Sequence, residues 1–209
     1  MTNRTPDKTA SLQVSRLTQY ASRRFRQAME IYQSEFPASS RLSRATVRQL
    51  LATNQYQLII AEHDSHVIGL ALIWLSSRPA FVHLDYLAIH NQEKGYGYGT
   101  TLYRWLCGHF TTLSPRATLL TLEVDEELIP FYRRSQTRVL HNVPYLYPGR
   151  RGPLPMHLMA YDRRQRQTLS QVQVQNIIRA LYYGLHHRNA EDSLLLSFLS
   201  QVPRQVRLV

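Results

Sequence analysis

The sequence predicts a mixed α/β fold, in which helices flank one sheet and a helical extension follows. Some segments repeat apolar residues at helical spacing, whereas others alternate apolar and polar residues, so both element types are expected. The chain has 209 residues, of which 44% are hydrophobic and 19% charged, and these values suit a folded protein. In chain order the segments follow the pattern ααβββαβαββ, which is typical of a layered α/β domain.

The N-terminal half holds two predicted helices and three predicted strands. Residues 1–16 are polar and are expected to form a flexible tail. The first helix ends before Pro37, and Ser43 can cap the second. His63-Asp64-Ser65 is predicted to join the first two strands as a hairpin turn. The predicted helices span 17–36 and 43–51, and the strands span 56–62, 66–75 and 81–90.

The C-terminal half continues the alternation and then changes in composition. The core elements expected here are a helix ending near 113, a strand over 118–124, a short helix over 126–135, and strands over 137–143 and 155–161. Apolar residues at helical spacing over 169–185 and 194–199 then predict a helical extension, whose second helix Asn189 could cap, with Asp192 in its first turn. The domains expected are a tail over 1–16, a core over 17–162 and an extension over 165–209. The extension is expected to pack on its own core or on a second copy, so the chain is a monomer or a homodimer.

Charge and cysteine content limit the classes of protein. The net charge is +11, and 23 of the 25 basic residues are arginine, with clusters at 23–26, 133–138, 150–151 and 163–166. Such clusters fit either a polyanion, such as nucleic acid or cofactor phosphates, or solvated surface arginines. The single Cys107 rules out an internal disulfide framework and fits a cytoplasmic location. The longest uncharged apolar run has nine residues, and the N-terminus has no signal-like apolar stretch, so no membrane association is expected.

A glycine-rich run provides the strongest local signal. Three of the eight glycines fall within Lys94-Gly95-Tyr96-Gly97-Tyr98-Gly99-Thr100, between a predicted strand and a predicted helix. Glycine admits positive φ, and the N–H groups at a helix N-terminus attract anions, so the run predicts a phosphate-binding loop. The chain has no Walker A string, and the G-x-G-x-G spacing fits a dinucleotide fingerprint poorly.

This run, together with the strand before it, resembles motif A of the GNAT acetyltransferase superfamily. That motif reads R/Q-x-x-G-x-G/A after a strand, here Leu84-Asp85-Tyr86-Leu87-Ala88-Ile89-His90. Lys94 stands at the Arg/Gln position with Gly97 and Gly99 as the motif glycines. A second arrangement uses Gln92, Gly95 and Gly97.

The resemblance extends over about 17–162, because the order of elements also agrees. Phe131-Tyr132-Arg133-Arg134 is similar to the tyrosine segment of the family's fourth helix, and Gln136-Thr137 stands where members often have Gly-Phe. The resemblance implies a GNAT-like fold, with a mostly antiparallel central sheet flanked by helices. It also implies acetyl-CoA as the acyl donor.

The resemblance also implies roles for individual residues. In the family, the pantetheine arm of CoA lies beside the strand, which assigns Leu87, Ala88 and Ile89 to backbone contacts at the thioester. One of their N–H groups would polarise the thioester carbonyl. Tyr132 corresponds to the general acid that protonates the departing thiolate. The pyrophosphate falls to the backbone N–H groups of Lys94, Gly95, Tyr96, Gly97, Tyr98, Gly99 and Thr100, with the Lys94 charge adding to them.

The general base is open between two residues. An amine acceptor is mostly protonated at pH 7, so direct attack needs a base or a water chain. Strand alternation predicts His83 and Asp85 on one face with Phe81 and Leu87, and the apolar 82, 84, 86 and 88 on the other. Asp85 or His83 could be the base, with Glu123 next, or the pair could simply bond to each other or to a neighbouring strand.

The sequence therefore predicts an acetyl-CoA-dependent N-acetyltransferase that works by direct attack in a ternary complex. Two alternatives are a catalytically silent acyl-CoA-binding or regulatory protein and a nucleic-acid-associated basic protein. No segment reads as a nucleic-acid recognition helix, so the latter is the weaker one. Cys107 is expected to be a buried structural thiol, and the nine histidines lack metal-ligand spacing, so no metal is expected.

Overall fold

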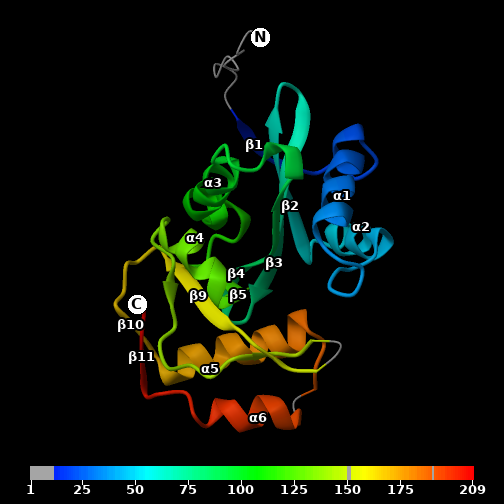
Figure 1. Ribbon diagram of the computed structural model, residues 1–209. Helices are drawn as coiled ribbons and strands as arrows, with labels where there is room; N and C mark the ends of the chain where they lie inside the picture. Colours follow the sequence, from blue (N-terminus) through cyan, green and yellow to red (C-terminus); the bar gives the residue numbers. More distant parts are fainter. Residues whose placement is uncertain (1–11, 150–151, 190) are drawn as a thin grey trace.

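A seven-stranded sheet forms the centre of the computed structural model, which describes residues 12–149, 152–189 and 191–209 (Figure 1). Its strands are β1 (Gln13–Leu17), β2 (Tyr56–His63), β3 (His66–Ser77), β4 (Ala80–Ile89), β5 (Leu119–Val124), β6 (Arg138–Val139) and β9 (His157–Asp162). They stand in the order β1-β2-β3-β4-β5-β9-β6. Neighbouring strands are antiparallel, except that β4 and β5 run parallel. The predicted mixed, mostly antiparallel sheet is confirmed.

Helices cover both faces of this sheet. They are α1 (Arg23–Glu35), α2 (Arg44–Ala52), α3 (Tyr98–Leu113), α4 (Ile129–Arg133), α5 (Gln171–Ala180) and α6 (Ser193–Leu199), with 3-10 turns η1 (Asn91–Glu93) and η2 (Glu126–Leu128) and a π-helical turn η3 (Leu181–Leu185). Helices α1 and α3 lie on opposite faces (Figure 1). Ser43 caps α2 as predicted, and its hydroxyl accepts the Thr46 N–H at 3.0 Å. Within the described ranges, no helix has both the length and the apolar character needed to cross a membrane.

The N-terminal segment differs from its prediction. Residues 13–16, which we expected in the flexible tail, belong to β1, which pairs with β2 along its whole length. The predicted helix from Leu17 starts only at Arg23, where the Ser22 hydroxyl accepts the Phe25 N–H at 3.2 Å. The strand forms because β2 presents an open edge whose backbone groups β1 satisfies. The rest of the expected tail, residues 1–11, lies outside the described residues.

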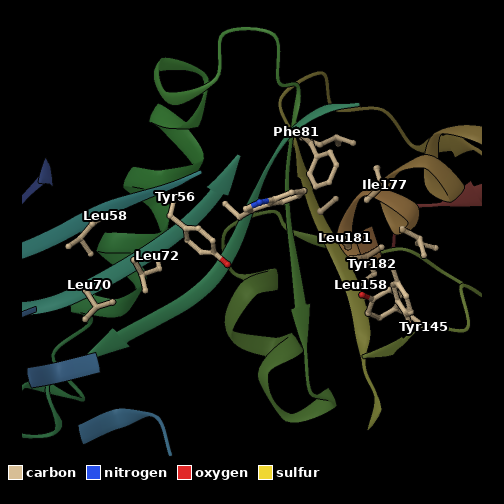
Figure 2. Packing of buried hydrophobic residues seen from close by; sticks show 14 of the residues in the cluster. Tyr56, Leu58, Leu70, Leu72, Phe81, Tyr145, Leu158, Ile177, Leu181 and Tyr182 are labelled. Atoms are coloured by element: carbon tan, nitrogen blue, oxygen red, sulfur yellow. The ribbon is translucent and has the colours of Figure 1, made fainter. Parts of the chain in front are cut away.

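The sheet separates two hydrophobic clusters. On the α3 face, buried residues include Val82 and Leu84 of β4 and Leu106 of α3. The opposite face carries α1 and the C-terminal extension, and its cluster includes Phe81 and Leu158. In Figure 2, Ile177, Leu181 and Tyr182 of the extension lie beside Tyr145 and Leu158 in this second cluster.

The C-terminal extension packs on its own chain, which is the first of the two arrangements that we predicted. Its apolar residues belong to the same cluster as the sheet, so the extension and the core share one hydrophobic interior. Two short strands, β10 (Thr168–Ser170) and β11 (Gln205–Arg207), pair with each other, and a bridge joins Leu208 to Leu140 beside β6. The prediction of Asn189 as the cap of α6 is wrong. Asp192 is the cap, and its Oδ1 accepts the N–H groups of Leu194 at 3.0 Å and Leu195 at 3.2 Å.

The predicted pair of closing strands is present as β6 and β9, which are antiparallel neighbours. The Pro/Gly loop between them carries a small hairpin of its own, made of β7 (Leu146–Tyr147) and β8 (Leu154–Pro155). The predicted Arg150-Arg151 cluster lies outside the described residues. The hairpin places Tyr145 and Tyr147 close to the C-terminal extension, with ring centroids 6.1 Å apart for Tyr145 and Tyr182.

Candidate functional site

The parallel strands β4 and β5 separate partway along their length. They pair only at Val82↔Leu120, His83↔Thr121 and Leu84↔Leu122. Beyond Leu84, β4 continues to Ile89 without a partner on the β5 side. The backbone N–H and C=O groups along that side of 85–89 are therefore available to an extended ligand that lies between the strands.

A β-bulge at Asp85 changes which side chains share a face. The β3–β4 pairing passes from Ile73↔Leu84 directly to Leu72↔Tyr86, so Asp85 is the extra residue. Strict alternation is lost at a bulge because two residues of one strand oppose one of the other. The predicted faces are therefore wrong beyond Asp85. Ala88 joins the cluster of Phe81, whereas Leu87 packs with the α3-face cluster.

The glycine loop forms the turn between β4 and α3. Gly95 and Gly97 have φ values of 88° and 83°, in the left-handed region that favours glycine. Gly97 is the N-cap of α3 and belongs to both arrangements of the motif. Gly99 lies inside the first turn of α3 and has no positive φ. The first N–H groups of α3 have no partners within the helix, so this end of the cleft attracts anions.

A cleft of about 590 Å³ lies between the glycine loop, β4 and α4. Nine of the ten residues that the sequence predicts for cofactor binding line it, together with Tyr132. The exception is Tyr96, which does not line the cleft and whose surface is 59% exposed. The Lys94 ammonium is paired with the Glu35 carboxylate at 2.5 Å, so α1 also contributes to this wall.

Tyr132 lies on α4 with its ring buried and its side chain lining the cleft. The ring packs edge-on against Tyr103, with centroids 4.8 Å apart. Burial raises the pKa of Tyr132 to about 12. The hydroxyl is therefore protonated at neutral pH and available as a proton donor.

The candidate bases His83 and Asp85 bond to neighbouring strands rather than to each other. The Tyr56 hydroxyl on β2 donates to Asp85 Oδ2 at 2.6 Å. His83 Nδ1 lies 3.0 Å from the Thr121 hydroxyl on β5. His83 is 1% exposed, whereas Asp85 is only partly buried, so Asp85 is the more accessible of the two. Burial raises the pKa of Asp85, against the lowering effect of the Tyr56 hydrogen bond.

Glu123 on β5 connects His83 to the C-terminal extension. Its Oε2 lies 3.7 Å from His83 Nε2, and its Oε1 lies 2.9 Å from His186 Nε2. The Tyr145 hydroxyl also donates to Oε1. The C-terminal extension therefore contacts this cluster through His186. No local sequence pattern marks His186 or Tyr145 for this cluster, because they lie 63 and 22 residues from Glu123.

The structure also shows the surroundings of Cys107, of one arginine cluster and of the possible metal ligands. Cys107 is buried in the α3-face cluster, and burial raises the pKa of its thiol to about 12, which suits the predicted structural role. One of the predicted basic clusters is partly neutralised, because Arg166 Nε donates to Asp162 Oδ2 at 2.6 Å. Within the described residues, no group of three or more His, Cys, Asp and Glu side chains is placed to hold a metal ion.

Comparisons with known proteins identify one matching family and several similar folds. The sequence matches the Acetyltransferase (GNAT) family over residues 25–136, more than half of the chain. A protein from Bacteroides thetaiotaomicron described as belonging to the GNAT family has a TM-score of 0.68 at 18% identity, covering 85% of this chain and 99% of its own. An aminoglycoside 6′-N-acetyltransferase in complex with coenzyme A has a TM-score of 0.59 at 13% identity, covering 74% of this chain and 98% of its own. At such identities the likeness shows the fold alone.

A curated relative aligns over a shorter part of its own length. An uncharacterized protein of Dictyostelium discoideum is 27% identical over 112 residues. The alignment covers 53% of this chain and 25% of the relative, so the chain spans about a quarter of that protein. This match therefore covers only part of this chain, and it assigns no activity to it.

Proposed function

Because the chain belongs to the GNAT acetyltransferase family, whose members take their acyl group from acetyl-CoA, we propose that it is an N-acetyltransferase that acts by direct attack in a ternary complex. The observation that carries this proposal is the separation of β4 and β5. It leaves a cleft that has an anion-attracting loop at one end and Tyr132 in its lining. Asp85 and His83 do not line this cleft, but they lie on β4 next to its unpaired residues. This layout supports a long anionic donor held along β4 and an acceptor that meets it near Asp85.

The residues that line the cleft fit acetyl-CoA. The N–H groups from Lys94 to Thr100 would hold the pyrophosphate at the start of α3, where Gly95 and Gly97 provide the positive φ that the turn requires. The unpaired backbone of Leu87, Ala88 and Ile89 would bond the pantetheine arm as an added strand. One N–H of that strand would polarise the thioester carbonyl.

The proposed acid and base lie on different elements, with Tyr132 on α4 and the two candidate bases on β4. Asp85 or His83, directly or through water, takes a proton from the ammonium of the acceptor. The amine nitrogen then bonds to the carbonyl carbon and loses a second proton to water as the C–S bond breaks. Tyr132 gives its proton to the departing thiolate and regains one from water. Two protons leave the nitrogen and one ends on the thiol, so one proton in total is released. The raised pKa of Tyr132, about 12, keeps that proton available at neutral pH.

The two candidate bases differ in a way that an experiment can resolve. Asp85 is partly exposed and has a raised pKa, caused by burial, which brings a carboxylate closer to the working range of a base. His83 is buried and its imidazole is held between Thr121 and Glu123. These observations favour Asp85 as the group that meets the acceptor and His83 as its support.

A thiol-release screen tests the proposal. Purified protein would be mixed with acetyl-CoA and with amines, amino acids, aminoglycosides and peptides, and free CoA thiol would be measured. We expect at least one acceptor class to give turnover that Asp85→Asn lowers about 10²-fold or more. Calorimetric binding of acetyl-CoA without turnover of any acceptor would instead indicate the silent CoA-binding alternative. A lack of binding would overturn both.

A further inference from the structure

His186 is held in a fixed place by the π-helical turn that ends the first helix of the C-terminal extension. The turn η3 follows α5 without a break, and the His186 N–H donates to the Leu181 carbonyl at 2.9 Å. Gly184 packs directly on Trp74 of β3, where a Cβ would lie 2.5 Å from Cζ2. Only glycine allows this approach, so contact with the sheet determines where the turn places His186.

The buried carboxylate of Glu123 is the partner of this imidazole. The exposed fractions of the side chains are 6% for Glu123, 9% for His186 and 1% for His83. A carboxylate buried to this extent needs opposite charge and hydrogen bonds, because desolvation would otherwise neutralise it. His186 provides the shorter of the two imidazole contacts, at 2.9 Å compared with 3.7 Å for His83.

We propose that His186 is a positioning residue of the active site, which holds Glu123 aligned on His83 so that His83 can support the general base. This inference rests on the proposed N-acetyltransferase function. It makes the C-terminal extension part of the acceptor side of the site and not only a cover for the sheet. His186, which follows Asp85 by 101 positions in the chain, thus belongs to the same cluster as Asp85, His83 and Glu123.

The electrostatic surroundings of Glu123 support this role. Burial raises the pKa of Glu123, but the His186 imidazole, followed by His83, outweighs that effect and holds the pKa well below its usual range. The groups that face the carboxylate are His83 of β4, His186 after η3 and the Tyr145 hydroxyl, and Asp85 is close enough to interact through its charge. Removal of His186 therefore removes the largest single contribution that keeps Glu123 ionised.

The first arm of the test measures activity across pH in His186→Leu and His186→Gln. The leucine variant lacks the imidazole and its N–H donor, whereas glutamine keeps a donor. We expect kcat of His186→Leu to fall about 10- to 100-fold, with the acidic limb moving to higher pH because His186 lowers the pKa of Asp85 as well as that of Glu123. KM for acetyl-CoA should change less than about twofold. His186→Gln should recover part of kcat.

The matched control is His187→Asn. His187 is the adjacent residue, is exposed, and has a φ of 53°, a conformation that asparagine also adopts. Its variant should keep the wild-type pH profile. A wild-type pH profile in His186→Leu would overturn the inference. Equal pH profiles in the leucine and glutamine variants, together with a loss of folded protein in both, would also overturn it, because His186 would then serve only the folding of the chain.

The second arm does not depend on activity. The carboxyl carbon of Glu123 would be followed by NMR as the pH is lowered, in the wild type, His186→Leu and His187→Asn. We expect the Glu123 titration to move up by about one pH unit or more in His186→Leu only. If it does not move, the inference fails even where the enzyme is active. If it moves but the wild type transfers no acyl group to any amine, the proposed function fails instead.

Discussion

The two parts of the proposed site are built from the chain in opposite ways. The proposed cofactor end comes from one short stretch, in which Gly95, Gly97 and the first turn of α3 follow β4 directly. The acid–base cluster, which is the proposed acceptor end, gathers Tyr56, Asp85, Glu123 and His186 from four separate segments. The difference teaches that an anion site can be encoded locally by backbone geometry. A buried acid–base cluster, in contrast, depends on the packing of the whole chain.

The largest effect is expected from removal of the C-terminal extension. Truncation after Arg164 deletes the buried Ile177, Leu181 and Phe198 and uncovers the cluster on that face of the sheet. Each such side chain contributes about 1.5–3 kcal/mol when buried, and the stability of a whole domain is only about 5–15 kcal/mol. We expect aggregation or loss of cooperative unfolding, measured by gel filtration and thermal denaturation. A soluble monomer with unchanged Tm would show that the acceptor end does not depend on this packing.

Two glycine variants sharpen the description of the cofactor end. Gly97 has a φ of 83°, so Gly97→Ala strains the backbone of the loop although its Cβ has nothing within 4 Å. In Gly99→Ala the Cβ would lie 3.6 Å from Ile89 and Phe131, which is ordinary contact. We expect Gly97→Ala to weaken acetyl-CoA binding about tenfold and Gly99→Ala less than about threefold, by calorimetry. Equal losses would mean that contact with the phosphates, and not backbone strain, dominates.

Tyr132 lines the cleft from α4 and tests the proposed proton donor. Tyr132→Phe keeps the ring packing on Tyr103 and removes only the hydroxyl. We expect kcat to fall about tenfold with an unchanged KM for acetyl-CoA. The loss is limited because a thiol of pKa about 8.5 can still leave as the thiolate without a proton donor, although more slowly. The basic limb of the pH–rate profile should not move, since the pKa of Tyr132 is raised to about 12. A shift of the basic limb in Tyr132→Phe would contradict this expectation and would show that the limb reports the ionisation of Tyr132.

Tyr56 tests the acceptor end through a single hydrogen bond. Its hydroxyl donates to Asp85 at 2.6 Å and lowers the pKa of that carboxyl, which burial raises. In Tyr56→Phe the lowering effect is lost, so the pKa of Asp85 rises further and the acidic limb of kcat/KM moves about one unit to higher pH. Asp85→Asn should remove that limb. If Tyr56→Phe leaves the limb in place while His83→Gln moves it, the base is His83.

The smallest effect is expected at Gln136, away from both ends. Gln136 is exposed and has a φ of 61°, at the position where relatives of the motif often carry glycine. The left-handed conformation costs a non-glycine residue about 1–2 kcal/mol, and glycine loses about 0.5–1 kcal/mol in unfolded-state entropy. Gln136→Gly should therefore raise the free energy of unfolding by about 0.5–1 kcal/mol in urea denaturation. The turnover of acetyl-CoA should stay as it is in the wild type.

The sequence by itself determined most of the elements and the glycine loop before α3. Helical and alternating periodicity predicted the helices and most strands, and the glycine run predicted the turn before α3, because these signals act over a few neighbouring residues. Only the tertiary structure decided the strand at Gln13–Leu17, the bulge at Asp85 and the contact between His186 and Glu123. The strand forms because it pairs with the open edge of β2, and the bulge forms because of how β3 pairs with β4. The third depends on the packing of Gly184 against Trp74. Each of these features depends on contacts with another segment of the chain, and a local sequence pattern does not predict such contacts.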